Sequence, residues 1–317
     1  MGHEVYLFAK AGSQTPSNGK LFLVKGTTEG QMDKNIEVWI ERKYHEIFMD
    51  VDIIHDCSLD HIIAERLYNL YGKTNIVNTI NGRTYYMPRP PFNVVTGSKY
   101  WQKEAKEMGN LNTEMIYWGV DTNFYTPGSA QEDQEDYYFW VSRFHPVKGL
   151  DIALDLAEYL GFKLKVAGSM EFRDHAEYGK KYLERIGQLS NVEYIQLPMN
   201  STHHEVKREL YRRAKAFLYP VQYPESFGLV VMEALACGTP VITTDQGAMP
   251  ELVKHGVSGF VCEKKRDFTL SIESLNILNI EWVRERCREN ALYFDWKVAA
   301  QDYEKLYEKV LNGYFWR

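Results

Sequence analysis

The strongest constraint on the fold is that short apolar runs alternate with amphipathic stretches along the chain. Several runs are apolar at almost every position, which is typical of parallel strands buried on both faces. Between them, apolar residues recur at three- and four-residue intervals, which predicts helices at Leu150–Leu160, Glu205–Lys215, Phe227–Cys237 and Trp296–Leu311. The alternation as a whole predicts an α/β fold with parallel sheets. The expected strands are Val5–Ala9, Leu21–Lys25, Val51–His55, Ile76–Ile80, Asn93–Thr96, Glu114–Tyr117, Tyr138–Ser142, Lys163–Ala167, Val192–Gln196, Ala216–Pro220, Pro240–Thr244 and Phe260–Cys262.

A domain boundary is expected near residue 126. The chain has 317 residues, enough for two domains of about 100–200 residues, each with its own core. Residues 126–136 are polar and acidic and contain a Pro-Gly pair, which is typical of an exposed linker.

Charge and cysteine content exclude several classes of protein. With 37 Lys and Arg against 43 Asp and Glu, the net charge of −6 argues against a nucleic-acid partner. No apolar run approaches the ~20 residues that a membrane span needs, although peripheral contact with a membrane stays open. The four cysteines have no metal-ligand spacing and are expected to be reduced thiols. With no signal-peptide pattern at the N-terminus, we expect a cytoplasmic protein.

The segment from Tyr219 to Glu233 carries the clearest candidate binding site. A predicted strand ends near Pro220, and Ser226 is expected to cap a helix that begins near Phe227. Ligands of open α/β sheets lie outside the carboxyl ends of the strands, and a helix N-terminus there suits a phosphate. Gly228 would let an anion approach the backbone closely.

Glu233 is unusual because it lies in a helix that is otherwise almost entirely apolar. A buried carboxylate needs partners. One turn beyond the helix tip, it could hold the ribose hydroxyls of a nucleotide whose diphosphate lies at the tip. A structural Glu paired with a distant Arg or Lys explains the pattern equally well.

Three further features follow other predicted strands. Arg143 and Lys148 flank a tight turn and could neutralise a diphosphate, or belong to an ordinary exposed basic turn. Glu225 lies in the loop before Gly228 and is expected to face the cleft. Gly247 lies in a loop that could bring backbone amides against a sugar, or in a simple β–α turn.

Taken in order, these motifs resemble a known family. The chain reads Arg-x4-Lys-Gly, then Glu-x-Phe-Gly-Leu-x3-Glu-Ala-x-Ala-x-Gly-x-Pro-Val, then Gly-x2-Pro-Glu-Leu-Val. This pattern resembles the retaining GT-B glycosyltransferases of family 4, also called glycosyl transferases group 1, most strongly over Phe139–Glu263. The segment around Asp121 and the closing Phe294-Asp-Trp296 also resemble that family. The resemblance implies two Rossmann-like domains facing across a cleft: 1–125 with 296–317 on the acceptor side, and 126–295 on the nucleotide-sugar side.

The resemblance also implies roles for individual residues of the donor site. Arg143 and Lys148 would bind the donor diphosphate and stabilise the leaving charge. Glu233 would hold the ribose, and Glu225 would contact the donor sugar. The backbone amides near Gly228, Leu229 and Val230 would contact phosphate, and those near Gly247 the sugar.

The reaction implied is transfer of a sugar, with retention of configuration, from a nucleotide-diphospho-sugar to an acceptor hydroxyl. The donor is expected to be UDP- or GDP-linked, and the acceptor a saccharide, a lipid-linked molecule or a small molecule. No cofactor and no catalytic metal are expected. His55 ends an apolar strand and is assigned a catalytic place in the cleft, with a hydrogen-bonded core histidine as the other interpretation.

The N-terminal part departs from the family pattern. The chain starts at the segment that resembles the family's second strand, so the first βα unit is expected to be missing. Cys57 stands where the family has a second histidine after the fourth strand. The alternative function is therefore a catalytically impaired GT-B protein that binds sugar nucleotides or serves as a subunit of a complex. An epimerase or a phosphorylase of the same fold is a third interpretation.

Overall fold

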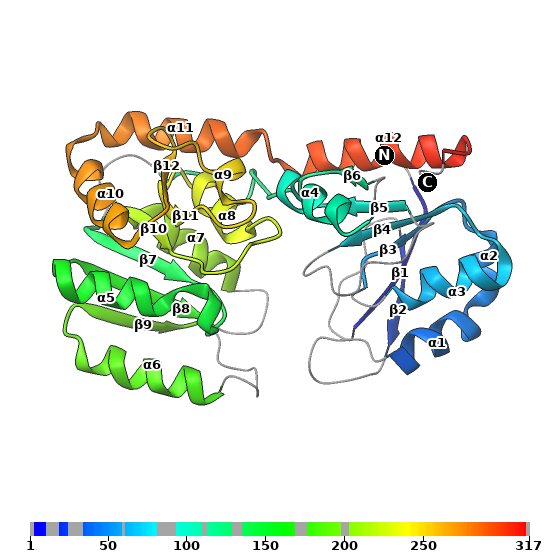
Figure 1. Cartoon of the computed structure of the whole chain (residues 1–317), viewed down its shortest axis with the longest axis horizontal. Coiled ribbons are helices and arrows are strands. Elements are labelled where there is room, and N and C mark those ends of the chain that lie inside the picture. Colours follow the sequence, from blue (N-terminus) through cyan, green and yellow to red (C-terminus); the bar gives the residue numbers. More distant parts are fainter. Residues whose placement is uncertain are drawn as a thin grey trace. The chain divides into compact units, whose positions relative to one another are not determined.

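The computed structural model describes residues 3–10, 19–24, 34–58, 61–80, 93–109, 113–128, 135–168, 176–197 and 203–314 (Figure 1). Packing divides the chain into two compact units, Met1–Val94 with Lys309–Arg317, and Val95–Glu308. The domain boundaries expected from the sequence, 1–125 with 296–317 and 126–295, stay a prediction.

The N-terminal elements form two small sheets. The elements are β1 (Val5–Lys10), β2 (Gly19–Val24), α1 (Lys34–Lys43), α2 (His45–Asp50), β3 (Ile54–Asp56), α3 (Ile62–Tyr71), β4 (Ile76–Ile80), β5 (Asn93–Thr96), α4 (Lys99–Glu107) and β6 (Thr113–Met115). Strands β1 and β2 pair in parallel, and the second sheet has the order β3-β4-β5-β6. Helix α3 buries Ile63, Ala64 and Leu67 and ends at Gly72, whose left-handed backbone lets its amide bond back to the last turn.

The larger unit is built on a six-stranded parallel sheet in the order β12-β11-β10-β7-β8-β9. Its elements are β7 (Tyr137–Val141), α5 (Leu150–Leu160), β8 (Lys163–Gly168), α6 (Ala176–Gln188), β9 (Val192–Gln196), α7 (His203–Arg213), β10 (Ala216–Tyr219), α8 (Leu229–Ala236), β11 (Val241–Thr244), α9 (Met249–Leu252), β12 (Gly259–Cys262), α10 (Lys265–Ile277), α11 (Ile280–Leu292) and α12 (Trp296–Leu311). From β7 the chain moves outward through β8 and β9, then returns to the other side of β7 with β10. The switch in strand order therefore lies between β7 and β10, where open α/β sheets bind their ligands.

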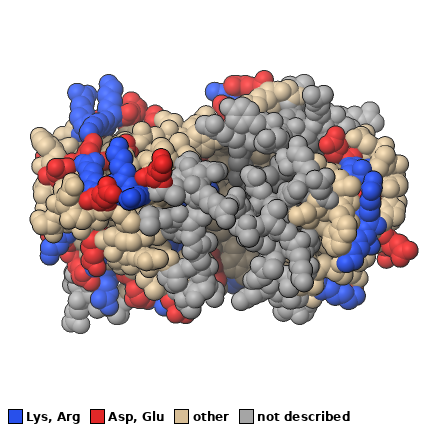
Figure 2. All heavy atoms as spheres, turned by 90° about the horizontal axis from the view of Figure 1, so that it is seen from below, with Lys and Arg blue, Asp and Glu red and all other residues tan. Residues whose placement is uncertain are grey.

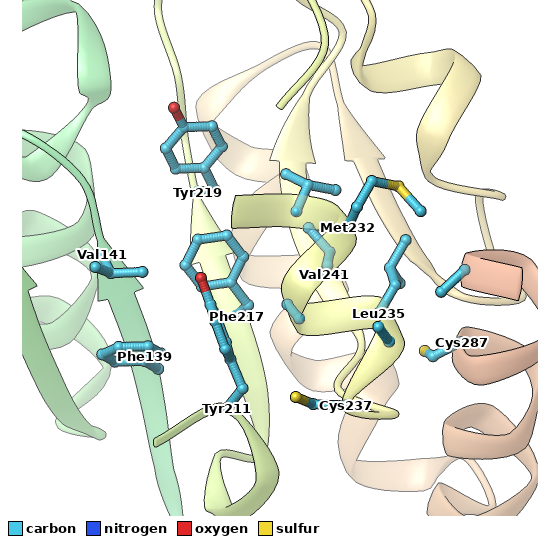
Figure 3. Close-up of a cluster of buried hydrophobic side chains, with 14 of the residues drawn as sticks. Phe139, Val141, Tyr211, Phe217, Tyr219, Met232, Leu235, Cys237, Val241 and Cys287 are labelled. Atoms are coloured by element: carbon cyan, nitrogen blue, oxygen red, sulfur yellow. The ribbon is translucent and has the colours of Figure 1, made fainter. Parts of the chain in front are cut away.

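The core of this unit lies on both faces of the sheet. On one face, Phe139 and Val141 of β7, Phe217 of β10 and α8 residues such as Met232 and Leu235 belong to one buried cluster (Figure 3). On the other face, alternate residues of the same strands, among them Tyr138, Trp140 and Leu218, pack against α5. Because both faces are covered, these strands are apolar at nearly every position, which is the pattern that predicted them.

Every strand expected from the sequence is present, with ends that differ by a few residues. The strand expected at Val51–His55 begins only at Ile54, because α2 runs to Asp50 and Val51 is its C-cap. Helices α5 and α12 have the expected bounds. In the described part of the chain, no helix is long and apolar enough to cross a membrane.

The surface carries charges of both signs. On the described part of the face in Figure 2, acidic and basic side chains are interspersed rather than segregated. Around α6, Arg185 bridges Asp155 and Glu158 with both contacts at 2.8 Å. The four cysteines are thiols rather than halves of disulfides.

Candidate functional site

Two of the predicted cations follow the carboxyl end of β7, at the switch point. Arg143 is exposed just beyond this strand, and Lys148 ends a short 3-10 turn, Pro146–Lys148. His145 caps that turn by accepting a hydrogen bond from the Val147 amide through Nδ1, at 3.2 Å. The turn holds Lys148 in a half-buried position rather than in open solvent.

Lys148 forms an ion pair with Glu225, which lies in the loop after β10. The side chains of Lys148 and Glu225 are only 12% and 15% exposed. The Tyr219 hydroxyl donates to the same Glu225 oxygen at 2.7 Å. Burial and the Glu225 carboxylate raise the pKa of Tyr219 well above its usual value, and Arg143 acts in the opposite direction. The charge of Arg143 therefore acts on the Tyr219 hydroxyl, which donates to Glu225.

The two loops that carry this pair are locked together through backbone contacts. The Gln222 amide donates to the Val147 carbonyl at 2.8 Å. Gly149 has a φ of 70°, and a Cβ built on it would lie 1.8 Å from the Pro220 carbonyl oxygen. A residue with a side chain cannot occupy position 149 without moving one loop away from the other. Gly149 thus sets how closely Lys148 approaches the loop of Glu225.

Gly247 similarly allows close backbone packing, in this case against Glu225 itself. It has a φ of 63°, pairs with Glu225 in an isolated parallel β-bridge, and leaves no room for a Cβ, which would lie 2.4 Å from Glu225 N and O. The next amide, that of Ala248, donates to the Glu225 carbonyl at 3.0 Å. The predicted Gly247 loop therefore lies directly against the backbone of Glu225.

The start of α8 differs from the sequence-based expectation in one respect. The helix begins at Leu229 rather than near Phe227, and Gly228, not Ser226, is its N-cap, with a φ of 110° and no side-chain cap. That left-handed conformation favours glycine over serine. The Gly228 carbonyl accepts from Val231 and Met232, which leaves the first amides of the helix, at Leu229 and Val230, without intrahelical partners. These amides follow Glu225 closely in the chain.

Glu233 lies one turn further into α8 and is 7% exposed. Lys207 of α7 donates to both of its oxygens, at 2.9 and 2.8 Å. The hydroxyls of Tyr125 and Tyr211 donate to it at 3.0 and 3.1 Å. The partners that a buried carboxylate requires are thus present. The ion pair between Lys207 and Glu233 is of the kind that the sequence analysis gave as the alternative to ribose binding, a Glu paired with a distant Arg or Lys. None of these three partners was identified from the sequence, because Lys207 lies 26 residues away on a helix with several other basic residues.

Glu251, which the sequence placed only at a helix start, connects two distant parts of the chain. It lies in α9, and its carboxylate accepts from the amides of Lys99 and Tyr100 at 2.9 and 2.8 Å. The Tyr117 hydroxyl donates to it at 2.7 Å. Glu251 therefore satisfies amides in the first turn of α4, whose N-cap Ser98 bonds only the Trp101 amide.

His55 belongs to the other unit, at the end of β3. Its Nε2 lies 2.7 Å from the Thr79 hydroxyl on the neighbouring strand β4. Burial lowers the pKa of His55 to about 4. The ring is therefore neutral at pH 7, which fits a hydrogen-bonded core histidine; its catalytic role stays a prediction.

A pH dependence of stability follows from His55. Its pKa is lower in the folded chain than the ordinary value of 6.5, so the unfolded chain binds more protons between these values. The free energy of unfolding is expected to fall as the pH drops from 6.5 toward 4, with a slope of up to about 1.4 kcal/mol per pH unit from this residue. Urea titrations at pH 7, 5.5 and 4.5 measure it. The His55→Asn variant should show a shallower slope, and equal slopes would contradict the assignment.

Within the described ranges, no three His, Cys, Asp or Glu side chains converge in a way that could hold a metal ion. The structure thus brings Arg143, Lys148, Glu225 and Gly247 together, with Gly228, Leu229 and Val230 next to them in the chain. Glu233 forms a separate buried network on the same helix α8.

Comparison with known proteins identifies the family. The family model for glycosyl transferases group 1 matches residues 121–292, which is more than half of the chain. The chain belongs to this family. Apart from His55, every predicted site residue lies within the matched segment, so the family and the site geometry point to the same unit.

Two curated relatives and one solved structure illustrate the relationship. An uncharacterized glycosyltransferase of Methanocaldococcus jannaschii is 29% identical over 80% of this chain and 69% of its own length. The D-inositol 3-phosphate glycosyltransferase of Mycolicibacterium smegmatis is 29% identical over 67% of this chain and 52% of its own length. The structure of Anabaena HepE in complex with UDP and glucose superposes with a TM-score of 0.71 at 19% identity, over 91% of this chain and 85% of that one.

This structural similarity confirms the predicted GT-B fold, with parallel sheets in an α/β arrangement. The chain is accordingly a glycosyltransferase by family. The expected absence of a first βα unit stays a prediction.

Proposed function

We propose that this group 1 glycosyltransferase transfers a sugar from a nucleotide-diphospho-sugar to an acceptor hydroxyl, with retention of configuration and without a metal. One observation carries the proposal. Arg143 and the Lys148–Glu225 pair lie at the switch point of a parallel sheet, and the uncapped start of α8 follows Glu225 in the chain. Positive charge and backbone amides at such a place suit a diphosphate.

The diphosphate would bind between the two cations and the amides of Leu229 and Val230. Lys148 is held by Glu225 and the locked turn, so its charge is already oriented before the donor arrives. Charge that develops on the leaving diphosphate would then be stabilised by preorganised groups, with little reorganisation during the reaction. The same positive groups would supply the electrostatic role that a metal has in other phosphate sites.

Glu225 would contact the donor sugar together with amides near Gly247, since Gly247 lies against its backbone. Glu233 would hold the ribose, and a catalytic role of His55 is part of the same proposal. Because Glu225 is occupied by Lys148 and Tyr219, we favour front-face attack by the acceptor over a covalent intermediate on Glu225. That route retains configuration.

The donor is proposed to be UDP- or GDP-linked. Support comes from HepE, a protein of the same fold whose structure is a complex with UDP and glucose. The acceptor is proposed to be a saccharide, a lipid-linked molecule or a small molecule, and the location to be cytoplasmic.

The test is calorimetry with UDP-glucose, GDP-mannose and ADP-glucose, followed by hydrolysis of the donor that binds. We expect micromolar to millimolar binding of one donor, slow release of its sugar with EDTA present, and an α-configured first product by proton NMR. Binding of none of the three would contradict the proposal. Loss of turnover in EDTA would contradict metal independence, and a β-configured first product would contradict retention. Tight binding without any turnover would favour the alternative of an impaired sugar-nucleotide-binding subunit.

A further inference from the structure

The carboxylate of Glu233 has no acceptor site left for a ligand. Its Oε1 accepts from Lys207 at 2.9 Å and from Tyr125 at 3.0 Å. Its Oε2 accepts from Lys207 at 2.8 Å and from Tyr211 at 3.1 Å. A carboxylate offers about four lone-pair sites, so these bonds fill it. A ribose hydroxyl that donates to Glu233 must therefore replace one of the three side chains.

Two of these side chains are poorly suited to leave. Lys207 is 7% exposed, and removing it would leave two buried charges uncompensated. Tyr211 is fully buried, and its ring packs edge-on against Phe139 and Phe217, with centroids 5.2 and 5.4 Å apart (Figure 3). Neither can turn away from Glu233 without disrupting the core.

Tyr125 differs from both. Unlike Lys207 it is neutral, and unlike Tyr211 it lies outside the helices and strands, in the described segment 121–128. Its side chain is also buried, at 5% exposed. Its backbone is anchored at both ends, because its amide donates to the Asp121 carbonyl at 2.8 Å and its carbonyl accepts from Arg288 at 2.8 Å. Release of Glu233 would then involve the side chain alone.

The Tyr125 hydroxyl also has a second partner that can keep it satisfied. It lies 2.8 Å from His204 Nδ1. A hydroxyl has one proton, so while Tyr125 donates to Glu233 the ring of His204 donates from Nδ1. Burial lowers the pKa of His204, which keeps the ring neutral, and a neutral ring can carry its proton on Nε2 instead. Tyr125 could then donate to Nδ1, with no change in the total number of protons.

We propose that Tyr125 is a specificity-determining residue of the pentose site: its hydroxyl occupies the place on Glu233 Oε1 that a ribose hydroxyl takes when a nucleoside diphosphate binds. The inference rests on the proposed function, which brings the ribose to Glu233. Because one hydrogen bond is exchanged for another, the wild-type protein gains little from the ribose hydroxyls. It should bind a ribonucleoside diphosphate and its 2′,3′-dideoxy form with similar affinity.

The test is calorimetry of wild type and Tyr125→Phe with UDP, GDP and ADP and with the 2′,3′-dideoxy form of the one that binds. The Phe ring keeps the packing of Tyr125 but opens one acceptor site on Oε1. We expect the variant to bind the ribonucleotide roughly 10- to 150-fold more tightly, which is the worth of one hydrogen bond to a charged group. Affinity for the dideoxy form should not change.

Tyr211→Phe is the matched control, because it opens a site on Oε2 that the aromatic core covers. Melting curves would verify that both variants fold. Unchanged or weaker ribonucleotide binding by Tyr125→Phe would overturn the inference while leaving donor binding intact. Equal tightening by Tyr211→Phe would overturn the assignment to Tyr125. If neither wild type nor Tyr125→Phe binds any of the three nucleotides, the proposed function fails and this inference fails with it.

Discussion

Replacing Lys148 with alanine is expected to lower kcat by about 10²–10³-fold, as removal of one preorganised charge stabiliser does. The side chain is 12% exposed and is held by Glu225, so its charge is fixed in place before the donor binds. The substitution also leaves the Glu225 carboxylate with Tyr219 as its remaining described donor, which disfavours an anionic donor beside it. Single-turnover hydrolysis of the donor measures the effect, with affinity measured separately.

Lys215→Ala is the matched control for this prediction. Lys215 immediately precedes β10, whereas Glu225 follows the carboxyl end of that strand. Lys215 pairs with Asp136 at 3.1 Å. Its removal is expected to change kcat by less than about twofold, because exposed ion pairs contribute little. If Lys148→Ala turned over at the wild-type rate, Lys148 would not stabilise the leaving group.

The second large effect is expected from Gly149→Ala. An alanine at a φ of 70° costs about 1–2 kcal/mol, and the contact of its Cβ with the Pro220 oxygen, 1.8 Å on the present backbone, adds about 1–3 kcal/mol. We expect the free energy of unfolding to fall by about 2–5 kcal/mol, at roughly 2–4 °C of Tm for each kcal/mol. Activity should fall as well, since the loop of Lys148 must move away from that of Glu225.

Gly161→Ala separates the two causes. Gly161 ends the same helix α5 that Gly149 begins, with a φ of 73° and nothing within 4 Å of an added Cβ. It should therefore lose only the conformational part, about 1–2 kcal/mol, and keep its activity. Equal losses of stability in the two variants, measured by thermal melts, would show that the contact with Pro220 contributes nothing to the change in the free energy of unfolding.

Much of the fold follows from the sequence because burial on two faces leaves a plain pattern. Strands such as β7 and β10 are apolar throughout, so their positions and their parallel pairing could be predicted from the local sequence pattern alone. The site was predictable for the same reason: Arg143 and Glu225 follow strands whose carboxyl ends must meet at one edge. The N-cap of α8 was not predictable, because serine and glycine both suit a cap, and only the backbone conformation at Gly228 decides between them.

Pairings between distant residues were beyond the sequence. Lys148 and Glu225 are separated by 77 positions, and nothing in either segment specifies the other as its counter-ion. The same holds for Lys207 and Glu233, since several other basic residues lie nearby on α7. A buried carboxylate indicates that it needs a partner but does not identify it, because the choice depends on how helices α7 and α8 pack.

The connection made by Glu251 has a consequence for synthesis of the chain on the ribosome. The amides of Lys99 and Tyr100 must wait for a carboxylate translated 152 and 151 residues later. At about 5–20 residues per second, the delay is roughly 8–30 seconds. During that interval the first turn of α4 must rely on Ser98 and water, so this helix end gains its full set of partners only after Glu251 has been translated.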